Sequence, residues 1–69
     1  MNKVEVYFCS GEINGVVRGN LEKIDNHMNV TITEATVEIC INNKCSKMNY
    51  PKIVVRGSSI IAVAYMNNY

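Results

Sequence analysis

The chain has 69 residues, and seven Lys and Arg against six Asp and Glu leave a formal charge of only +1. This length and charge exclude a multidomain protein and a polybasic monomer that binds by bulk attraction, so we expect one domain over residues 1–69. A domain of this size buries only about 60% of its unfolded surface, so we expect it to gain stability from oligomerisation.

The apolar residues are those of strands. Nine Val and eight Ile stand against one Leu and three Ala, and β-branched side chains fit a pleated surface but lose rotamer freedom in a helix. No helical period of useful length occurs, and no apolar run approaches the roughly 18 residues of a membrane span. The composition predicts a soluble all-β protein.

Alternating side chains predict a first strand over residues 4–9, which ends at the turn signal Ser10–Gly11. Asn14–Gly15 is a second turn signal, and the next strand is expected over Val16–Ile24. Gly19 lies inside that strand, where a missing side chain permits a tight bend.

A polar turn at Asp25–Asn29 precedes a long strand over residues 30–41. Its apolar residues occupy even positions up to Ile32 and odd positions from Ala35 onward, so the inward face changes near Glu34. Such a change within one strand requires an extra residue, a β-bulge, which bends the strand. We therefore expect this strand to serve two sides of a small barrel.

The last third of the chain predicts a short strand and a final strand. Asn42–Lys44 breaks the pattern, Pro51 precedes a strand at Ile53–Val55, and the final strand spans Ser59–Tyr65. The final strand is apolar on both faces, and as a monomer's edge it would be an aggregation hazard unless another strand paired with it. This argues for strand addition between subunits.

Two separated motifs resemble the signature of the Sm/LSm family. Gly19–Leu21 with Asp25–Asn29 matches G-x-L-x-x-x-D-x-x-M-N, and Arg56–Ile60 matches R-G-x-x-[IV]. The resemblance extends from Val4 to about Tyr65. It implies a small five-stranded, strongly bent antiparallel barrel of the Sm/SH3-like kind. In such proteins the fourth strand of one subunit pairs with the fifth of the next, usually in a ring of seven.

The resemblance also implies that single-stranded, uridine-rich RNA binds in the ring lumen, at the turns of Asp25–Asn29 and Arg56–Ser59. Splayed bases are recognised by stacking on planar side chains and by hydrogen bonds to their edges. His27 can supply a stacking face, Arg56 a planar cation, and Asn29 both a donor and an acceptor. The residues assigned to RNA binding are His27, Asn29, Arg56, Gly57, Ser58 and Asp25.

Several of these residues also have a structural interpretation. For Asp25, capping of its turn is favoured above direct RNA contact. Arg56 could form an intersubunit ion pair instead of stacking. Met28 is expected to plug the core, and Gly19 is expected to be purely structural.

The chain departs from the family pattern in its first loop and at its start. Seven residues separate Gly11 from Gly19, where members commonly have four, which predicts a longer first loop or a turn at Asn14–Gly15. The chain begins at its first strand, so the family's N-terminal helix is expected to be short or absent. Ser58 in place of Asp favours a eukaryotic-type chain in a heteromeric ring, whereas His27 before Met-Asn is also typical of archaeal homo-oligomers.

Neither the cysteines nor the Ser, His and Asp residues of the chain indicate a metal site or an enzyme active site. Cys9, Cys40 and Cys45 are an odd set that is expected to stay as free thiols in a reducing compartment. With His27 they contain the residue types of a zinc site, but the spacing is wider than usual, and we expect no metal and no cofactor. No nucleophile has a base in a recognisable motif, so we expect no enzyme.

The sequence thus predicts an Sm/LSm ring subunit that binds U-rich single-stranded RNA and scaffolds a small nuclear ribonucleoprotein in pre-mRNA splicing. The expected localisation of the protein is the nucleus and also the cytoplasm. The expected partners are a small nuclear RNA and other Sm/LSm subunits, with no membrane. One alternative is an LSm subunit at the 3′ end of a U6-type RNA or in mRNA decay. Another is an SH3-like barrel that acts only in protein assembly.

Overall fold

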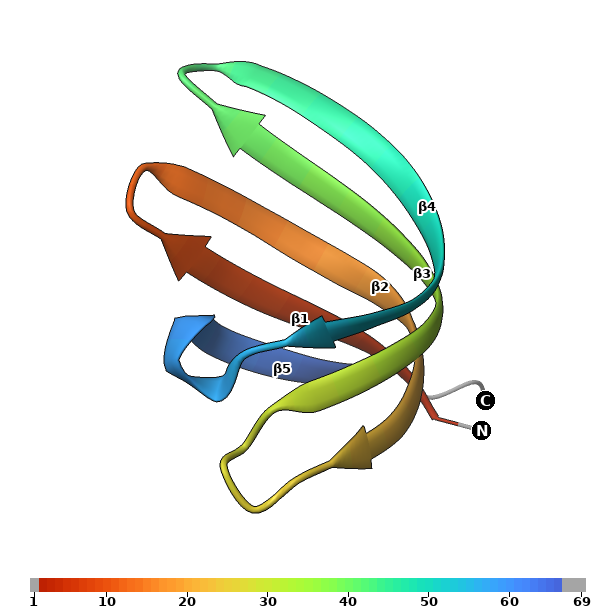
Figure 1. Ribbon diagram of the computed structural model, residues 1–69. Coiled ribbons are helices and arrows are strands. Elements are labelled where there is room, and N and C mark those ends of the chain that lie inside the picture. The colour runs from red at the N-terminus through yellow and green to blue at the C-terminus, as the bar shows by residue number, and fades with distance from the viewer. Residues whose placement is uncertain (1, 67–69) are drawn as a thin grey trace.

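The computed structural model describes residues 2–66, which form one antiparallel sheet with the strand order β4-β3-β2-β1-β5. Figure 1 shows the long middle strands bending strongly, so that the sheet curls round on itself. The predicted all-β fold of five antiparallel strands is confirmed, and no helix precedes the first strand within the described residues. The elements are β1 (Lys3–Ser10), β2 (Ile13–Ile24), β3 (Val30–Ile41), β4 (Lys44–Val55), the 3-10 turn η1 (Gly57–Ser59) and β5 (Ile60–Met66).

The sheet is open between its two edge strands. β4 and β5 lie at opposite ends of the strand order, and no ladder joins them among residues 2–66. Both edges carry apolar side chains that the chain by itself leaves exposed: Val54 on β4 is 56% exposed, and Ile61 and Tyr65 on β5 are 67% and 54% exposed. The last strand is therefore an apolar edge, as predicted. In the same part of the chain, no helix has the length and apolar character that crossing a membrane requires.

One row of residues across the sheet produces the bend. The β2–β3 register shifts so that Gly19 lies opposite both Glu34 and Ala35. Glu34 has a positive φ of 50°, and an extra residue of this kind bends a strand and increases its twist. A Cβ on Gly19 would come within 2.7 Å of the Thr33 carbonyl oxygen. The predicted bulge near Glu34 and the structural role of Gly19 are thus confirmed.

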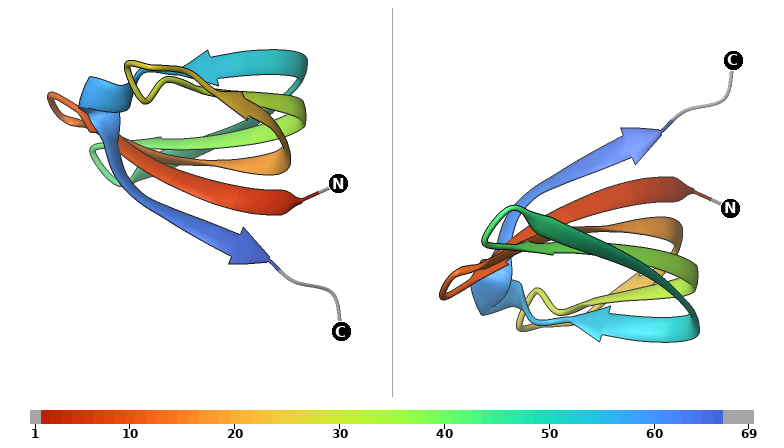
Figure 2. Two further views of the ribbon diagram at one scale, coloured as in Figure 1. Left: turned by 90° about the horizontal axis from the view of Figure 1, so that it is seen from below. Right: turned by 90° about the horizontal axis from the view of Figure 1, so that it is seen from above.

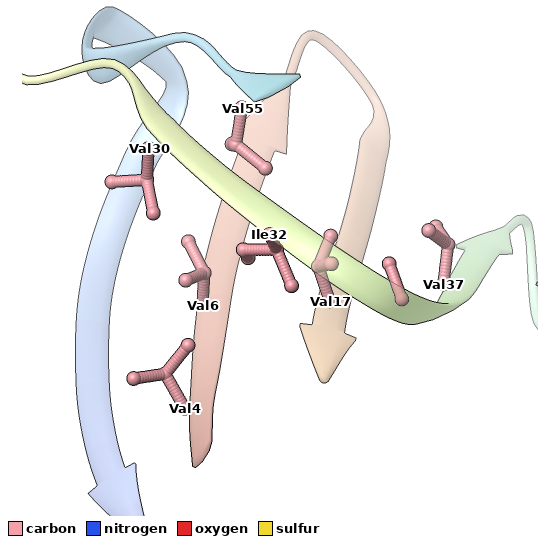
Figure 3. Close-up of a cluster of buried hydrophobic side chains, with 8 residues drawn as sticks. Val4, Val6, Val17, Val30, Ile32, Val37 and Val55 are labelled. Atoms are coloured by element: carbon pink, nitrogen blue, oxygen red, sulfur yellow. The ribbon is translucent and has the colours of Figure 1, made fainter. Parts of the chain in front are cut away.

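The core lies inside the curl of the sheet and consists mostly of β-branched side chains (Figure 3). Val4, Val6 and Ile32 are completely buried. The buried apolar residues of β3 change from even to odd positions at the bulge, so that both halves of this strand contribute to the same core. The buried cluster comprises Val4, Val6, Val17, Val30, Ile32, Ala35, Val37 and Val55.

The first hairpin turns at Gly11–Glu12, where the β1–β2 register leaves only these two residues unpaired. Gly11 has the positive φ, 63°, that a tight turn needs. Gly15 lies within β2, where an added Cβ would be 2.5 Å from Cζ of Phe8. The predictions of a longer first loop and of a turn at Asn14–Gly15 are therefore wrong: the additional residues lengthen β2, and glycine makes room for an aromatic ring.

β4 is much longer than the strand predicted at Ile53–Val55. It begins at Lys44, directly after a tight turn in which Asn42 and Asn43 have φ values of 49° and 68°. Asparagine tolerates this conformation, which two-residue hairpins require. Pro51 lies inside β4, which is an edge strand and so tolerates a missing N–H. The prediction that Pro51 stands before the strand is wrong for this reason.

Cys40 and Cys45 are direct partners in the β3–β4 ladder and are joined by a disulfide, with their Cα atoms 4.0 Å apart. Cys9 remains a free thiol. The expectation of three free thiols is therefore wrong, because the tight turn brings two of them into register. Among residues 2–66 no group of three or more His, Cys, Asp or Glu side chains could hold a metal ion.

An ionic network crosses three strands on the outer face of the sheet. Arg18 on β2 contacts Glu5 on β1 at 2.7 Å and Glu38 on β3 at 3.3 Å. The Tyr7 hydroxyl also donates to Glu5 at 3.0 Å. The hydrogen bond from Arg18 holds the pKa of Glu5 below its usual value. These residues fix β1, β2 and β3 to one another on the side away from the core.

Candidate nucleic-acid interface

Two turns that are far apart in the sequence meet at one end of the sheet. The first, residues 25–29, joins β2 to β3, and the second contains η1 and follows β4 (Figures 1 and 2). The backbone N–H of Gly57 donates to Oδ1 of Asn29 at 2.8 Å. This hydrogen bond brings together the two segments to which the sequence analysis assigned RNA binding.

Asp25 organises the first turn. Its Oδ1 accepts hydrogen bonds from the backbone N–H groups of His27 at 2.8 Å and Asn29 at 2.9 Å. Its Oδ2 accepts from the Asn29 side-chain amide at 3.0 Å. The hydrogen bonds from Asn29 hold the pKa of the Asp25 carboxyl below its usual value. The structure thus gives Asp25 the turn-capping contacts that the sequence analysis favoured.

Asn29 has a fixed amide orientation. Its nitrogen must face the acceptor Asp25, and its oxygen must face the donor Gly57. Because an amide carries two hydrogens and two lone pairs, one donor and one acceptor remain for another molecule. The side chain is only partly buried, so this remaining pair can reach a ligand.

Gly57 is required by the contact between the two turns. A Cβ at this position would lie 2.5 Å from the carbonyl oxygen of His27 and 2.9 Å from that of Met28. The sequence analysis assigned this glycine to RNA binding. The structure shows that its missing side chain first admits the backbone of the other turn. The Asn29 contact to Gly57 was also missed, because nothing in the sequence marks a hydrogen bond across 28 positions.

His27, Arg56 and Ser58 are exposed on the two joined turns. Arg56 has extended backbone directly before η1. Among the described residues, none of these three side chains makes a hydrogen bond or ion pair within the chain. The two joined turns therefore present an imidazole, a guanidinium and a hydroxyl in addition to the held amide of Asn29. These are the groups needed to stack a base and to hydrogen-bond its edge.

Met28 does not plug the core as the sequence analysis expected. It is 63% exposed and has a positive φ of 64°. Its backbone N–H donates to the Asp25 carbonyl at 3.1 Å, so the hydrogen bonds of the turn impose this conformation. The side chain is consequently directed outward from the turn instead of into the sheet.

Comparisons with known proteins agree with this fold. A family model described as the LSM domain matches residues 2–65. The chain is 31% identical to the Sm protein of Pyrococcus abyssii in complex with a uridine heptamer, with a TM-score of 0.69 over 94% of this chain and 83% of that one.

It is also 32% identical to the SmAP (LSm) protein of Methanococcus vannielii, with a TM-score of 0.66 over 90% of this chain and 76% of that one. A heptameric archaeal Sm protein, 24% identical, has the same fold with a TM-score of 0.65 over 96% of this chain and 87% of that one. A search of curated proteins gave no match.

Proposed function

The chain belongs to the Sm/LSm family, and on that basis we propose that it is a ring subunit that binds uridine-rich single-stranded RNA at the joined turns. Proteins of this family bind RNA and are not enzymes, so the function is binding without turnover. The observation that carries the proposal is the hydrogen-bonded set Asp25, Asn29 and Gly57, which holds the two turns together.

The locked amide of Asn29 suits uracil. A uracil edge offers one N–H donor beside carbonyl acceptors, whereas cytosine offers an acceptor nitrogen beside an amino donor. An amide that could rotate freely would accept either pattern. Because Asp25 and Gly57 fix its orientation, Asn29 offers its free donor and acceptor in one arrangement only. The uridine heptamer bound to the related Pyrococcus protein is consistent with this preference.

The two open edges supply the ring. Among residues 2–66, β4 and β5 each lack a neighbour on one side, and both expose apolar side chains. Pairing β4 of one subunit with β5 of the next satisfies both edges and repeats the RNA site around a closed assembly. Each site then contributes a modest affinity, and a continuous RNA strand gains from their number.

The charge is unevenly distributed along the chain. Lys44, Lys47, Lys52 and Arg56 are the only charged residues after Glu38. Lys52 forms an ion pair with Glu22 at 3.3 Å, so Lys44, Lys47 and Arg56 give this part of the chain its excess positive charge, although the whole chain is nearly neutral. This arrangement favours a phosphate backbone and predicts that binding weakens as salt increases.

The narrower role in pre-mRNA splicing, in the nucleus and also the cytoplasm, stays a prediction of this proposal. It is supported by the Arg56–Ile61 motif, whose Ser58 favours a eukaryotic-type, heteromeric ring. The archaeal origin of the compared proteins favours a homomeric ring instead. The native mass of the purified chain distinguishes the two: a ring of this chain alone supports the homomeric form, and dependence on partner subunits supports the heteromeric form.

The proposed function is tested by measuring the binding of oligouridine and oligocytidine to the wild type and to His27→Ala, Asn29→Ala and Arg56→Ala. Each variant should weaken oligouridine binding by about 1–3 kcal/mol per lost stack or edge contact, while the native mass stays that of the assembled ring. Asn14→Ala is a matched control, because this exposed asparagine lies on β2, within the β1–β2 and β2–β3 ladders, and not in either turn.

Equal affinity for oligouridine and oligocytidine would show that Asn29 does not select uracil. Unchanged oligouridine affinity in all three variants would refute the RNA site. That result would instead favour a barrel that serves only in protein assembly.

A further inference from the structure

The Cys40–Cys45 disulfide lies where β3 loses its second neighbour. Asn14–Cys40 is the last pair of the β2–β3 ladder, whereas the β3–β4 ladder continues through Cys40–Cys45 to Ile41–Lys44. Beyond the disulfide the hairpin is therefore a ribbon of two strands, visible as the upper tip in Figure 1. A two-stranded ribbon alone is marginally stable in water, so the bond lies where it has most effect on local order.

The two cysteines are at least partly exposed and already lie opposite each other. Cys45 is exposed on an edge strand, and Cys40 is partly exposed on its neighbour. Backbone pairing places them opposite each other, so forming or breaking the bond requires no rearrangement of the sheet. Cys9 is two strands away, opposite Asn14, and its thiol remains free. The chain thus contains one cysteine pair that is placed for thiol–disulfide exchange, and the free thiol of Cys9 serves as an internal comparison.

We propose that Cys40 and Cys45 form a reversible thiol–disulfide clasp on the outer half of β4. The oxidised clasp holds residues 44–49 against β3, and reduction lets the hairpin tip open. The bond closes a short loop, with a sequence separation of 5, and short loops gain least from a disulfide. Reduction therefore loosens the tip while the remainder of the β3–β4 ladder keeps the chain folded.

The chemistry needs a thiol–disulfide couple, such as reduced and oxidised glutathione. During closure, the Cys45 thiolate attacks one sulfur of the oxidised couple and releases one thiolate, leaving a mixed disulfide. The Cys40 thiolate then attacks Sγ of Cys45 and expels the second thiolate. The two protons of the protein thiols end on the two released thiolates, so the protein loses two electrons to the couple.

The consequence for assembly rests on the proposed function. Residues 44–49 belong to the free edge of β4, on which β5 of the next subunit would pair. An ordered edge loses less conformational entropy on pairing than a frayed one. The oxidised form should consequently assemble at lower protein concentration than the reduced form.

The test uses the full chain, equilibrated in oxidised or reduced glutathione, with alkylation and hydrogen exchange read by mass spectrometry. In the oxidised protein only Cys9 should be alkylated, and reduction should add Cys40 and Cys45. Amide exchange over residues 40–47 should accelerate on the order of tenfold on reduction. Cys9→Ser should retain this response, whereas a Cys40→Ser/Cys45→Ser double variant should exchange rapidly under both conditions.

The clasp would be overturned if Cys40 and Cys45 were alkylated in the oxidised protein. It would also be overturned if the amide exchange rate over residues 40–47 were the same in the oxidised and the reduced protein. Measuring the native mass in both redox states tests the proposed ring independently of the clasp. A ring whose concentration dependence is the same in both redox states overturns the assembly consequence and leaves the RNA-binding ring intact. A chain whose hairpin responds to reduction but which assembles in neither state supports the clasp and refutes the ring.

Discussion

Replacement of Gly57 by alanine should disturb both the stability of the chain and the proposed RNA site. The added Cβ would lie 2.5 Å from the His27 carbonyl oxygen and 2.9 Å from that of Met28. To reach even 3.0 Å, the two turns must separate by about 0.5 Å. Both opposing atoms belong to the backbone of a turn held by Asp25, so neither can rotate away as a side chain would.

Overpacking of this kind costs about 1–3 kcal/mol. For a domain of this size, each kcal/mol lowers the melting temperature by roughly 4–8 °C. The same displacement stretches the 2.8 Å hydrogen bond from Gly57 to Asn29 and frees the amide to which we assign the selection of uracil. The preference for oligouridine above oligocytidine should therefore fall together with stability.

Thermal unfolding and fluorescence anisotropy with both oligonucleotides measure the two effects, at one protein concentration because assembly contributes to stability. Ser58→Ala is the matched control for stability, since its exposed side chain lies on the same turn. A Gly57→Ala variant with the melting temperature and uracil preference of the wild type would refute the tight contact between the turns.

Three further predictions follow from local geometry. Because folding lowers the pKa of Asp25, the stabilising contribution of this carboxylate should be complete at pH values above its ordinary pKa of 3.8. The contribution should be lost as the pH falls through the lower folded pKa. Asp25→Asn should remove this pH dependence of thermal unfolding. Glu34→Gly should raise the free energy of unfolding by about 1 kcal/mol, since Glu34 has a positive φ that costs a non-glycine residue this much; an unchanged denaturation midpoint would contradict the strain. Gly15→Ala should lower stability by about 1–3 kcal/mol in the same assay, because its Cβ meets the Phe8 ring and the Glu38 carbonyl; an increase in stability would contradict the close packing at Gly15.

The bend and the core could be predicted because side-chain alternation reports directly which face of a strand is buried. The change of parity near Glu34 in β3 indicated a bulge, and that is where the register shifts. Side-chain polarity was a poorer guide in β4, because an edge strand has no second neighbour and its residues from Lys44 to Lys52 are all exposed. Without a buried face to impose alternation, only the Ile53–Val55 end resembled a strand.

Glycines and cysteines were the least predictable positions, because their roles depend on contacts between distant segments. Asn14–Gly15 has the residue types of a turn, yet Gly15 instead accommodates the ring of Phe8. Cys40 and Cys45 were expected to be unpaired, but the turn at Asn42–Asn43 places them directly opposite each other in the β3–β4 ladder. In the candidate site, the residue types could be identified from the motif, whereas the hydrogen bond that joins the two turns could not.

The row that bends the sheet has a consequence for the size of any closed assembly. Gly19 on β2 and Glu34 on β3 lie at one level of the sheet, between the two edge strands through which successive subunits would join. The fold along this row sets the wedge angle of each subunit. Head-to-tail contacts close into a ring only when these wedges complete a full turn, and otherwise continue as a helical filament. In the proposed ring, two residues that lie on neither edge strand would therefore set how many copies surround the RNA.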